Sequence, residues 1–261
     1  MELLQSIKSR TQQVCPLHQT KKKSAQIYWI LRNETQEFRS ANFRKIHESN
    51  LAHLFELYDA HFFDNEITRL LRSLKQPLSF RLSGKMTRSG GTTTREEIWQ
   101  GKKLLDRKYE IAISTTLMFQ TFKDTHKTVN VTGIDCIDRL QALQRIMEHE
   151  IIHLVEMMIW YHSDCFRKRF QSITGRLFGH TESTHELTTG DERAFQEFGI
   201  RVGQQVSFVH GGKKFRGFVN RITKRATVLV ATSRGELFSD GKRYSRFYVP
   251  VQNLIPEKKS A

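Results

Sequence analysis

The feature that most constrains this chain is one helical pattern that carries two histidines and a glutamate. "MEHEIIHLVE", residues 147–156, places His149, Glu150 and His153 in the order HExxH. Large apolar residues recur around it at helical spacing: Leu140, Leu143, Met147, Ile151, Leu154 and Met158. The pattern predicts a long, half-buried helix that begins at a capping-box-like "TGID" (132–135) and runs to about residue 160.

The HExxH spacing suits a metal site with a built-in base. Residues four apart on a helix differ by about 40° and about 6 Å of rise, so His149 and His153 can face one ion. Neutral imidazole is the commonest zinc ligand. Glu150 is rotated about 100° from His149 and can instead take a proton from a metal-bound water. The alternative is two inert histidines on a half-buried helix, in a chain that contains eleven.

A catalytic zinc needs a third protein ligand and one open position. Downstream candidates are Glu156, His162, His180 and His185, the last two in the loop "GHTESTHEL". His162 can ligate only if the helix stops near residue 160 and the chain doubles back. "HSDCF" makes this feasible, because Ser163 or Asp164 can cap a new helix there.

The remaining N-terminal chain predicts an α+β domain. Residues 1–48 contain "HQTKKKS" and "AQIYWILRN", which indicate a basic arm with a short helix. "NLAHLFELYDAHFF", from Asn50, predicts a helix that buries Leu51, Leu54, Phe55 and Tyr58. After Pro77 the period changes to two in "LSFRLSGKMT" and again in "YEIAIST", which predict strands on either side of a turn at "RSGGTTT".

The chain from about residue 200 has the pattern of short strands. Alternating runs are separated by Gly211-Gly212, Lys224-Arg225, Arg234-Gly235 and Asp240-Gly241. Four or five strands in about sixty residues fit a small SH3-like β-barrel. We therefore predict three parts: a basic arm (1–48), an α+β domain in which the HExxH helix packs on a small sheet (49–197), and an all-β barrel (198–261).

Positive charge is concentrated in the predicted barrel. From Phe198 onward there are thirteen Lys or Arg against three Asp or Glu, a net +10 of the chain's +15. Such asymmetry indicates a polyanionic partner, most often nucleic acid; a solvated basic surface is the alternative. Nine candidate phosphate contacts are Lys213, Lys214, Arg216, Arg221, Lys224, Arg225, Lys242, Arg243 and Arg246.

Aromatic residues are interleaved with these cations and could stack on exposed bases. They are Phe208, Phe215, Phe218, Tyr244 and Phe247. The alternation of the strands favours a core role for Phe208 and Phe218. For Tyr244 and Phe247, in a looser segment, base stacking and core packing are equally favoured.

Cysteine usage and hydropathy indicate the compartment. Cys15, Cys136 and Cys165 are widely spaced and form no CxxC pair, which argues against a disulfide framework and a cysteine-based zinc module. No run approaches 18 apolar residues, and "MELLQSIKSRTQQVCPLHQTKKK" lacks the apolar core of a secretory signal. We expect a cytoplasmic protein without a membrane partner, nucleoid-associated if the source is bacterial.

Taken in order, these motifs resemble the SprT-like zinc metalloproteases, the family that includes Spartan. "LFELYDAHFFDN" is similar to its entry helix, and "FRLSGKMTRSGGTTT" with "YEIAIS" to its strand-rich stretch. HExxH follows, and then "HSDCF" in place of an "HGxxF"-like element, with Ser163 where the family has Gly and a short spacer after His153. The similarity covers about residues 49–187. The cysteine-free basic barrel stands where many relatives carry a four-cysteine zinc ribbon.

The resemblance implies a zincin-like fold with one Zn²⁺ on His149, His153 and His162, and with Glu150 as the catalytic base. It further implies a DNA-associated metalloendopeptidase that digests proteins bound or crosslinked to DNA, as in DNA–protein crosslink repair. Its partners would be protein substrates and DNA, single-stranded or structured. Two alternatives remain: a non-catalytic nucleic-acid-binding protein with a structural zinc closed by His180 or His185, and a barrel that binds an acidic protein.

Overall fold

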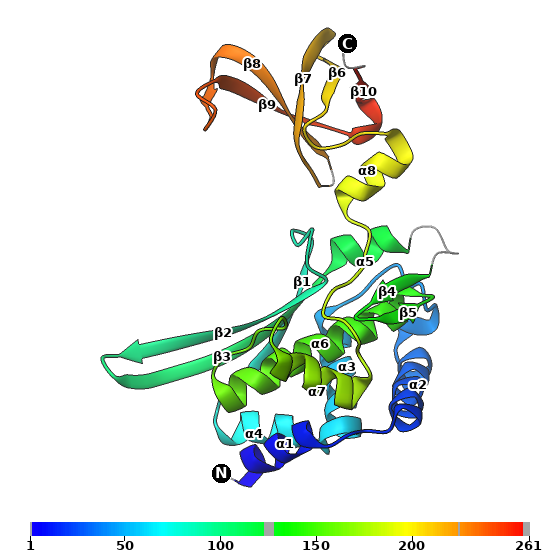
Figure 1. Cartoon of the computed structure of the whole chain (residues 1–261), viewed down its shortest axis with the longest axis vertical. Coiled ribbons are helices and arrows are strands. Elements are labelled where there is room, and N and C mark those ends of the chain that lie inside the picture. The colour runs from blue at the N-terminus through cyan, green and yellow to red at the C-terminus, as the bar shows by residue number, and fades with distance from the viewer. Residues whose placement is uncertain (1, 123–127, 224, 258–261) are drawn as a thin grey trace. The chain divides into compact units, whose positions relative to one another are not determined.

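The computed structural model describes residues 2–122, 128–223 and 225–257. The chain divides into two compact units, the first ending at Leu187 and the second starting at Thr188. The described residues form eight α-helices, a three-stranded mixed sheet, a two-stranded sheet and a five-stranded antiparallel sheet near the C-terminus (Figure 1). The predicted α+β class is confirmed at this level.

Seven of these helices belong to the first unit, and α6 is the longest. They are α1 (Glu2–Gln12), α2 (Leu17–Glu34), α3 (Glu48–Phe63), α4 (Glu66–Ser73), α5 (Thr115–Thr121), α6 (Arg139–Trp160) and α7 (Lys168–Phe178). All six apolar residues of the predicted stripe on α6 are buried. The helix starts later than predicted because residues 129–136 form a hairpin, and Asp138 then caps α6 by accepting the Gln141 N–H at 2.8 Å.

The mixed sheet has the order β1-β3-β2. β1 (Leu78–Ser83) runs parallel to β3 (Lys103–Ser114), whereas β2 (Gly91–Gln100) is antiparallel to β3 and forms an edge that lies along α6 (Figure 1). The small hairpin consists of β4 (Val129–Val131) and β5 (Ile134–Cys136). Strand β2 was not predicted: its first residues were interpreted as a turn, although their side chains approach the site on α6.

The first 48 residues are not a separate arm. They form α1, α2 and a 3₁₀ turn (Gln36–Arg39), and they contribute Ile27, Leu31, Phe38 and Phe43 to the main hydrophobic core. These four side chains are fully buried. The arm prediction is corrected for a physical reason: the polar residues between these apolar ones cover the solvent side of α2, so the segment has a polar composition although it packs.

The second unit holds helix α8 (Gly190–Phe198) and the five-stranded sheet. Its strands are β6 (Gln205–His210), β7 (Lys213–Ile222), β8 (Ala226–Leu237), β9 (Arg243–Val249) and β10 (Ile255–Pro256), in the order β10-β6-β7-β8-β9, with a 3₁₀ turn at Val251–Asn253. The division falls before α8, not near residue 198, because Ala194 of α8 joins the hydrophobic cluster of this unit. Among the described residues, no helix is long and apolar enough to cross a membrane.

Candidate metal centre

Helix α6 presents His149 and His153 to each other. Their Nε2 atoms lie 3.1 Å apart. A tetrahedral zinc with Zn–N bonds of about 2.0–2.1 Å would hold two such atoms roughly 3.3 Å apart. Phe170 of α7 packs against both imidazoles, with ring centroids at 4.7 Å and 4.4 Å. The two rings are therefore held at a separation that suits a shared ion.

Cys165 is the third residue of this group. The candidate ligand atoms of His149, His153 and Cys165 all lie within 4.8 Å of one another, so the group could hold a metal ion. Helix α6 ends at Trp160, and Tyr161 adopts the left-handed conformation (φ 58°), which turns the chain back toward the helix. Cys165 lies in the loop that follows this turn.

His162, the third ligand predicted from the sequence, does not belong to this group. It is exposed, and its carbonyl oxygen accepts a hydrogen bond from Nη2 of Arg169 at 2.8 Å. The sequence allowed for a turn of the chain near Tyr161. It indicated His162, and not Cys165, as the side chain of "HSDCF" that returns to the histidines. Only two residues separate His162 from Cys165, so the path of the loop alone decides which of the two side chains reaches the histidines.

The other sequence candidates have different partners. His180 is buried, and its Nε2 contacts Glu148 at 2.8 Å; Glu148 also accepts from Tyr58 and pairs with Arg145. His185 borders the same cavity as the histidine pair, and its Nε2 accepts the Gly90 N–H at 3.0 Å. Neither lies close enough to join the group of candidate ligands in the described chain.

Glu150 lies beside the histidines with its carboxyl buried against strand β2. Thr93 Oγ1 lies 2.8 Å from Oε2 and 3.0 Å from the Glu150 carbonyl oxygen, and donates to them. The Gly91 backbone also lies against this carboxyl group: a Cβ added to Gly91 would lie only 2.6 Å from Glu150 Oε1. Burial raises the pKa of Glu150 to about 8, partly offset by the Thr93 hydrogen bond. Helix and edge strand together therefore fix this carboxyl group.

The protonation states of the group suit a cation. Burial lowers the pKa of His149 to about 3 and that of His153 to about 4, so both imidazoles are neutral at pH 7, the form that binds metal. Nδ1 of His149 is buried and has no hydrogen-bond partner among the described residues. Burial also raises the pKa of Cys165, and coordination would favour its thiolate. Two imidazoles and a thiol are a donor set that zinc accepts.

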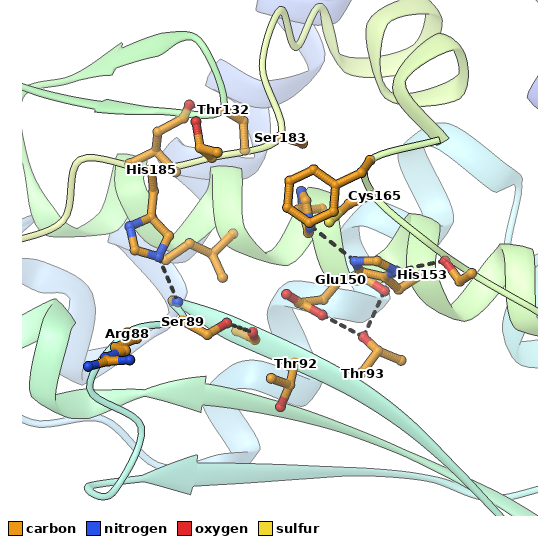
Figure 2. A pocket seen from close by; sticks show the side chains of 18 of the residues that line it. Arg88, Ser89, Thr92, Thr93, Thr132, Glu150, His153, Cys165, Ser183 and His185 are labelled. Atoms are coloured by element: carbon orange, nitrogen blue, oxygen red, sulfur yellow. Dashed lines mark hydrogen bonds between the residues drawn. The ribbon is translucent and has the colours of Figure 1, made fainter. Parts of the chain in front are cut away.

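These residues share a cavity of about 500 Å³ in the first unit. Its walls come from the start of β2, the middle of α6, the loop after α6 and residues 183–185. Figure 2 shows Glu150, His153 and Cys165 gathered on one side, with Thr93 facing Glu150 and His185 across from them. Phe166 borders the opening and is 74% exposed. The cavity is large enough for a peptide segment or a small ligand.

In the second unit, eight of the nine predicted basic residues are exposed, and Lys224 lies outside the described residues. Arg216 pairs with Glu257 and Arg246 with Glu236, while Arg243 donates to the Gly235 carbonyl oxygen. Among the described residues, the remaining five form no ion pair: Lys213, Lys214, Arg221, Arg225 and Lys242.

The strand register separates these cations into two groups. Lys213 and Lys214 begin β7, and Lys242 lies in the turn just before β9, at the same end of the sheet. Arg221 is near the end of β7 and Arg225 lies in the turn that follows, at the other end. Lys213 and Arg221 are eight positions apart along the strand, which corresponds to about 25 Å. These five cations thus lie in two clusters at opposite ends of the strands, instead of in one patch.

The predicted aromatics are mostly internal. Phe208 is buried and contacts Phe215 and Phe247, with ring centroids at 5.7 Å and 5.3 Å. Tyr244 is buried too, lies edge-on to Phe218 at 5.3 Å and donates its hydroxyl to Asp240. The core interpretation is confirmed for Phe208, whereas Phe218 is only partly buried and does not belong to the hydrophobic cluster of this unit; Tyr244 is buried. The exposed aromatic of this sheet is Tyr248 (64%), which the pattern did not single out.

Four residues around the metal centre were not recognised as functional from the sequence: Gly91, Thr93, Ser163 and Cys165. The alternation in "GGTTTREEIW" could have indicated strand β2, but the chain offers no local signal for its approach to Glu150. The chain was compared with protein-family models, curated proteins and solved structures, and none of them matches.

Proposed function

We propose that this protein is a zinc-dependent endopeptidase of the SprT-like type, associated with DNA and acting on proteins bound or crosslinked to it. The observation that carries the proposal is the pair of Nε2 atoms 3.1 Å apart on α6, with the Glu150 carboxyl group beside them in one cavity. A metal-binding pair next to a buried base is what peptide hydrolysis requires.

In this proposal His149, His153 and Cys165 hold one zinc ion. When bound, the ion supplies a Lewis acid and lowers the pKa of a coordinated water to about 7. Glu150, positioned by Thr93, accepts the proton of the water that attacks the peptide carbonyl and delivers it to the leaving amine. A nearby cation would also favour the ionised form of Glu150, which burial alone disfavours.

The position of strand β2 supports the proposal that the substrate is a polypeptide. It is an edge strand, and Gly91, Thr92 and Thr93 line the cavity. An extended peptide can add to such an edge through main-chain hydrogen bonds. We therefore assign the first unit to the zincin-like architecture, in which a helix bearing HExxH packs against a small sheet.

The strand arrangement and the charge of the second unit support the proposed association with DNA. Five antiparallel strands in about fifty residues fit an SH3-like barrel, and its exposed lysines and arginines carry most of the chain's net charge. Neutralising phosphates with these side chains releases counterions and makes binding salt-dependent. We propose that this unit holds nucleic acid while the first unit cleaves protein, in the cytoplasm or at the nucleoid.

A second candidate is a non-catalytic nucleic-acid-binding protein with a structural zinc. The presence of Cys165 favours it, because structural zinc sites commonly use thiolates. Such a site needs a fourth protein ligand. His185, on the opposite wall of the cavity, would have to give up its hydrogen bond with Gly90 to supply one.

Metal analysis tests the ligand set. We expect about one zinc per chain in the wild type, and loss of zinc in His149→Ala, His153→Ala and Cys165→Ala. His162→Ala is the matched comparison from the same loop and should retain zinc. If His162→Ala loses the metal and Cys165→Ala keeps it, the ligand set predicted from the sequence is correct and the proposed one is wrong.

Casein cleavage with and without single-stranded DNA tests the reaction. We expect Glu150→Gln to keep zinc and lose cleavage, and His153→Ala to lose both. A wild-type protein that binds zinc and DNA but cleaves neither casein nor itself would support the structural-zinc alternative. Equal cleavage by Glu150→Gln and wild type would exclude the mechanism.

A further inference from the structure

We infer that Ser163, Glu156 and Arg169 form a hydrogen-bond relay that fixes the tautomer of His153, which makes Ser163 a positioning residue of the metal centre. The inference rests on the proposed function, because the tautomer of His153 matters only if His153 binds a metal. The contacts themselves do not depend on a metal. They run from the His153 imidazole through Ser163 to the buried Glu156 carboxylate and on to the Arg169 guanidinium.

The relay consists of three consecutive contacts. Nδ1 of His153 lies 2.7 Å from the Ser163 hydroxyl oxygen. That hydroxyl donates to Oε2 of Glu156 at 2.7 Å. The other carboxylate oxygen, Oε1, accepts from Nε of Arg169 at 2.6 Å. Each member is therefore paired on both sides, from the imidazole to the guanidinium.

The chemistry of the groups sets the direction of these bonds. A serine hydroxyl has one proton, and a carboxylate can only accept. The Ser163 proton is directed to Glu156, so the serine oxygen must accept from Nδ1–H of His153. Nε2 of His153 then carries the lone pair, and this is the atom that faces Nε2 of His149 at 3.1 Å. The relay thus selects the tautomer that can bind a metal.

The relay is anchored in the fold. Glu156 is 1% exposed and lies two turns after His149 on α6. Arg169 belongs to the first turn of α7, donates to the His162 carbonyl oxygen at 2.8 Å and lies over the Trp160 ring at 4.5 Å. It therefore ties together the end of α6, the loop that carries Cys165 and the start of α7.

The two histidines differ in this respect. Within the described part of the chain, the buried Nδ1 of His149 has no hydrogen-bond partner, whereas Nδ1 of His153 has Ser163. Metal-binding histidines usually donate their second N–H, and loss of that outer partner typically weakens metal affinity 10- to 100-fold. Ser163 is therefore the outer partner that His153 has and that His149 lacks among the described residues.

The first test observes the tautomer in the metal-free full-length protein. Long-range ¹H–¹⁵N spectra of histidine-labelled protein distinguish Nδ1–H from Nε2–H. We expect His153 to be the Nδ1–H tautomer in the wild type and in Ser163→Thr, which keeps the hydroxyl, and a mixture in Ser163→Ala. A wild-type His153 protonated at Nε2 overturns the inference, whether or not the protein binds zinc.

The second test measures zinc affinity by competition with a chromophoric chelator. We expect Ser163→Ala and Glu156→Gln to weaken zinc binding 10- to 100-fold and Ser163→Thr to restore it. Ser183→Ala, which removes a hydroxyl from the same cavity, is the control and should bind like wild type. Wild-type affinity in Ser163→Ala overturns the inference; a wild type that binds no zinc overturns the proposed function, and the tautomer measurement still decides the relay.

Discussion

The candidate metal centre of the first unit and the basic sheet of the second are assigned the two halves of the proposed function, and they are built differently. At the centre, specific contacts hold the side chains: Thr93 holds Glu150, Ser163 holds His153, and Phe170 packs against both histidines. On the sheet, Lys213, Arg221 and their neighbours are exposed and spread over two ends.

The difference follows from solvation. A buried polar group costs free energy unless it is paired, so a buried site tolerates few arrangements and a single atom added or removed has a large effect. Exposed cations act through a screened, long-range field to which each contributes a little. Substitutions should therefore have large and specific effects in the first unit, and small, additive ones in the second.

Gly91→Ala should have the largest effect. The new Cβ would lie 2.6 Å from Glu150 Oε1 and 2.8 Å from its Cγ, so the carboxyl group must move. We expect casein cleavage to fall about 100-fold, as a displacement of about 1 Å can cause, while zinc content stays unchanged. Gly90→Ala is the control, because the three atoms nearest to its Cβ belong to Ile146, Leu187 and His185, not to Glu150, and lie 3.1 Å away or more. Equal losses in both variants would contradict the role of this contact.

The pH dependence of stability is the next largest effect. The pKa of Glu150 is raised to about 8 in the folded state from an ordinary 4.5, so its contribution to stability is present below pH 4.5 and is lost as the pH rises through 8. Metal-free wild type should therefore lose a few kcal/mol relative to Glu150→Gln between pH 5 and pH 9.

Urea unfolding of both proteins at pH 5, 7 and 9 checks this. The histidines act in the opposite direction: their pKa values are lowered on folding, so their contribution is lost as the pH falls below 6.5. That loss is common to both proteins and cancels in the comparison. A stability difference that stays constant with pH would show that Glu150 is not buried as described.

Thr93→Val should have a moderate effect. It keeps the shape of the side chain but removes the hydroxyl that donates to Glu150 at 2.8 Å. We expect kcat for casein to fall about 10-fold, with little change in KM, because the interaction orients the base and not the substrate. Thr93→Ser should retain most activity. An unchanged kcat in Thr93→Val would show that the Thr93 hydroxyl does not help to orient Glu150.

Charge removal in the second unit should have the smallest effect. Lys213→Ala with Lys214→Ala should weaken single-stranded DNA binding several-fold and lower the slope of log K against log salt by about 1–2. Casein cleavage without DNA should not change. Arg216→Ala should matter less, because Glu257 already pairs with Arg216. A loss of DNA affinity as large as the loss of cleavage expected for Gly91→Ala would mean that the sheet binds DNA at a specific buried site.

Much of the fold followed from local patterns. The apolar stripes predicted α3 and the buried face of α6, and the alternating runs predicted β1, part of β3 and most strands of the second unit. These predictions succeed because burial of one face imposes a period that neighbouring residues reveal. The segment of α2 was interpreted as a basic arm with only a short helix, and the first residues of β2 as a turn. Polar and threonine-rich segments have weak periodicity, and their structure depends on the residues that pack against them.

The sequence by itself determined that His149 and His153 would face one another beside Glu150, because helix geometry fixes residues three and four apart without help from the rest of the chain. Only the tertiary structure decided what surrounds them. The loop after Tyr161 brings in Cys165 and Ser163 and leaves His162 exposed, and strand β2 brings Thr93 to Glu150 across 57 residues of sequence. Such contacts depend on loop paths and packing, for which a single sequence carries no periodic signal.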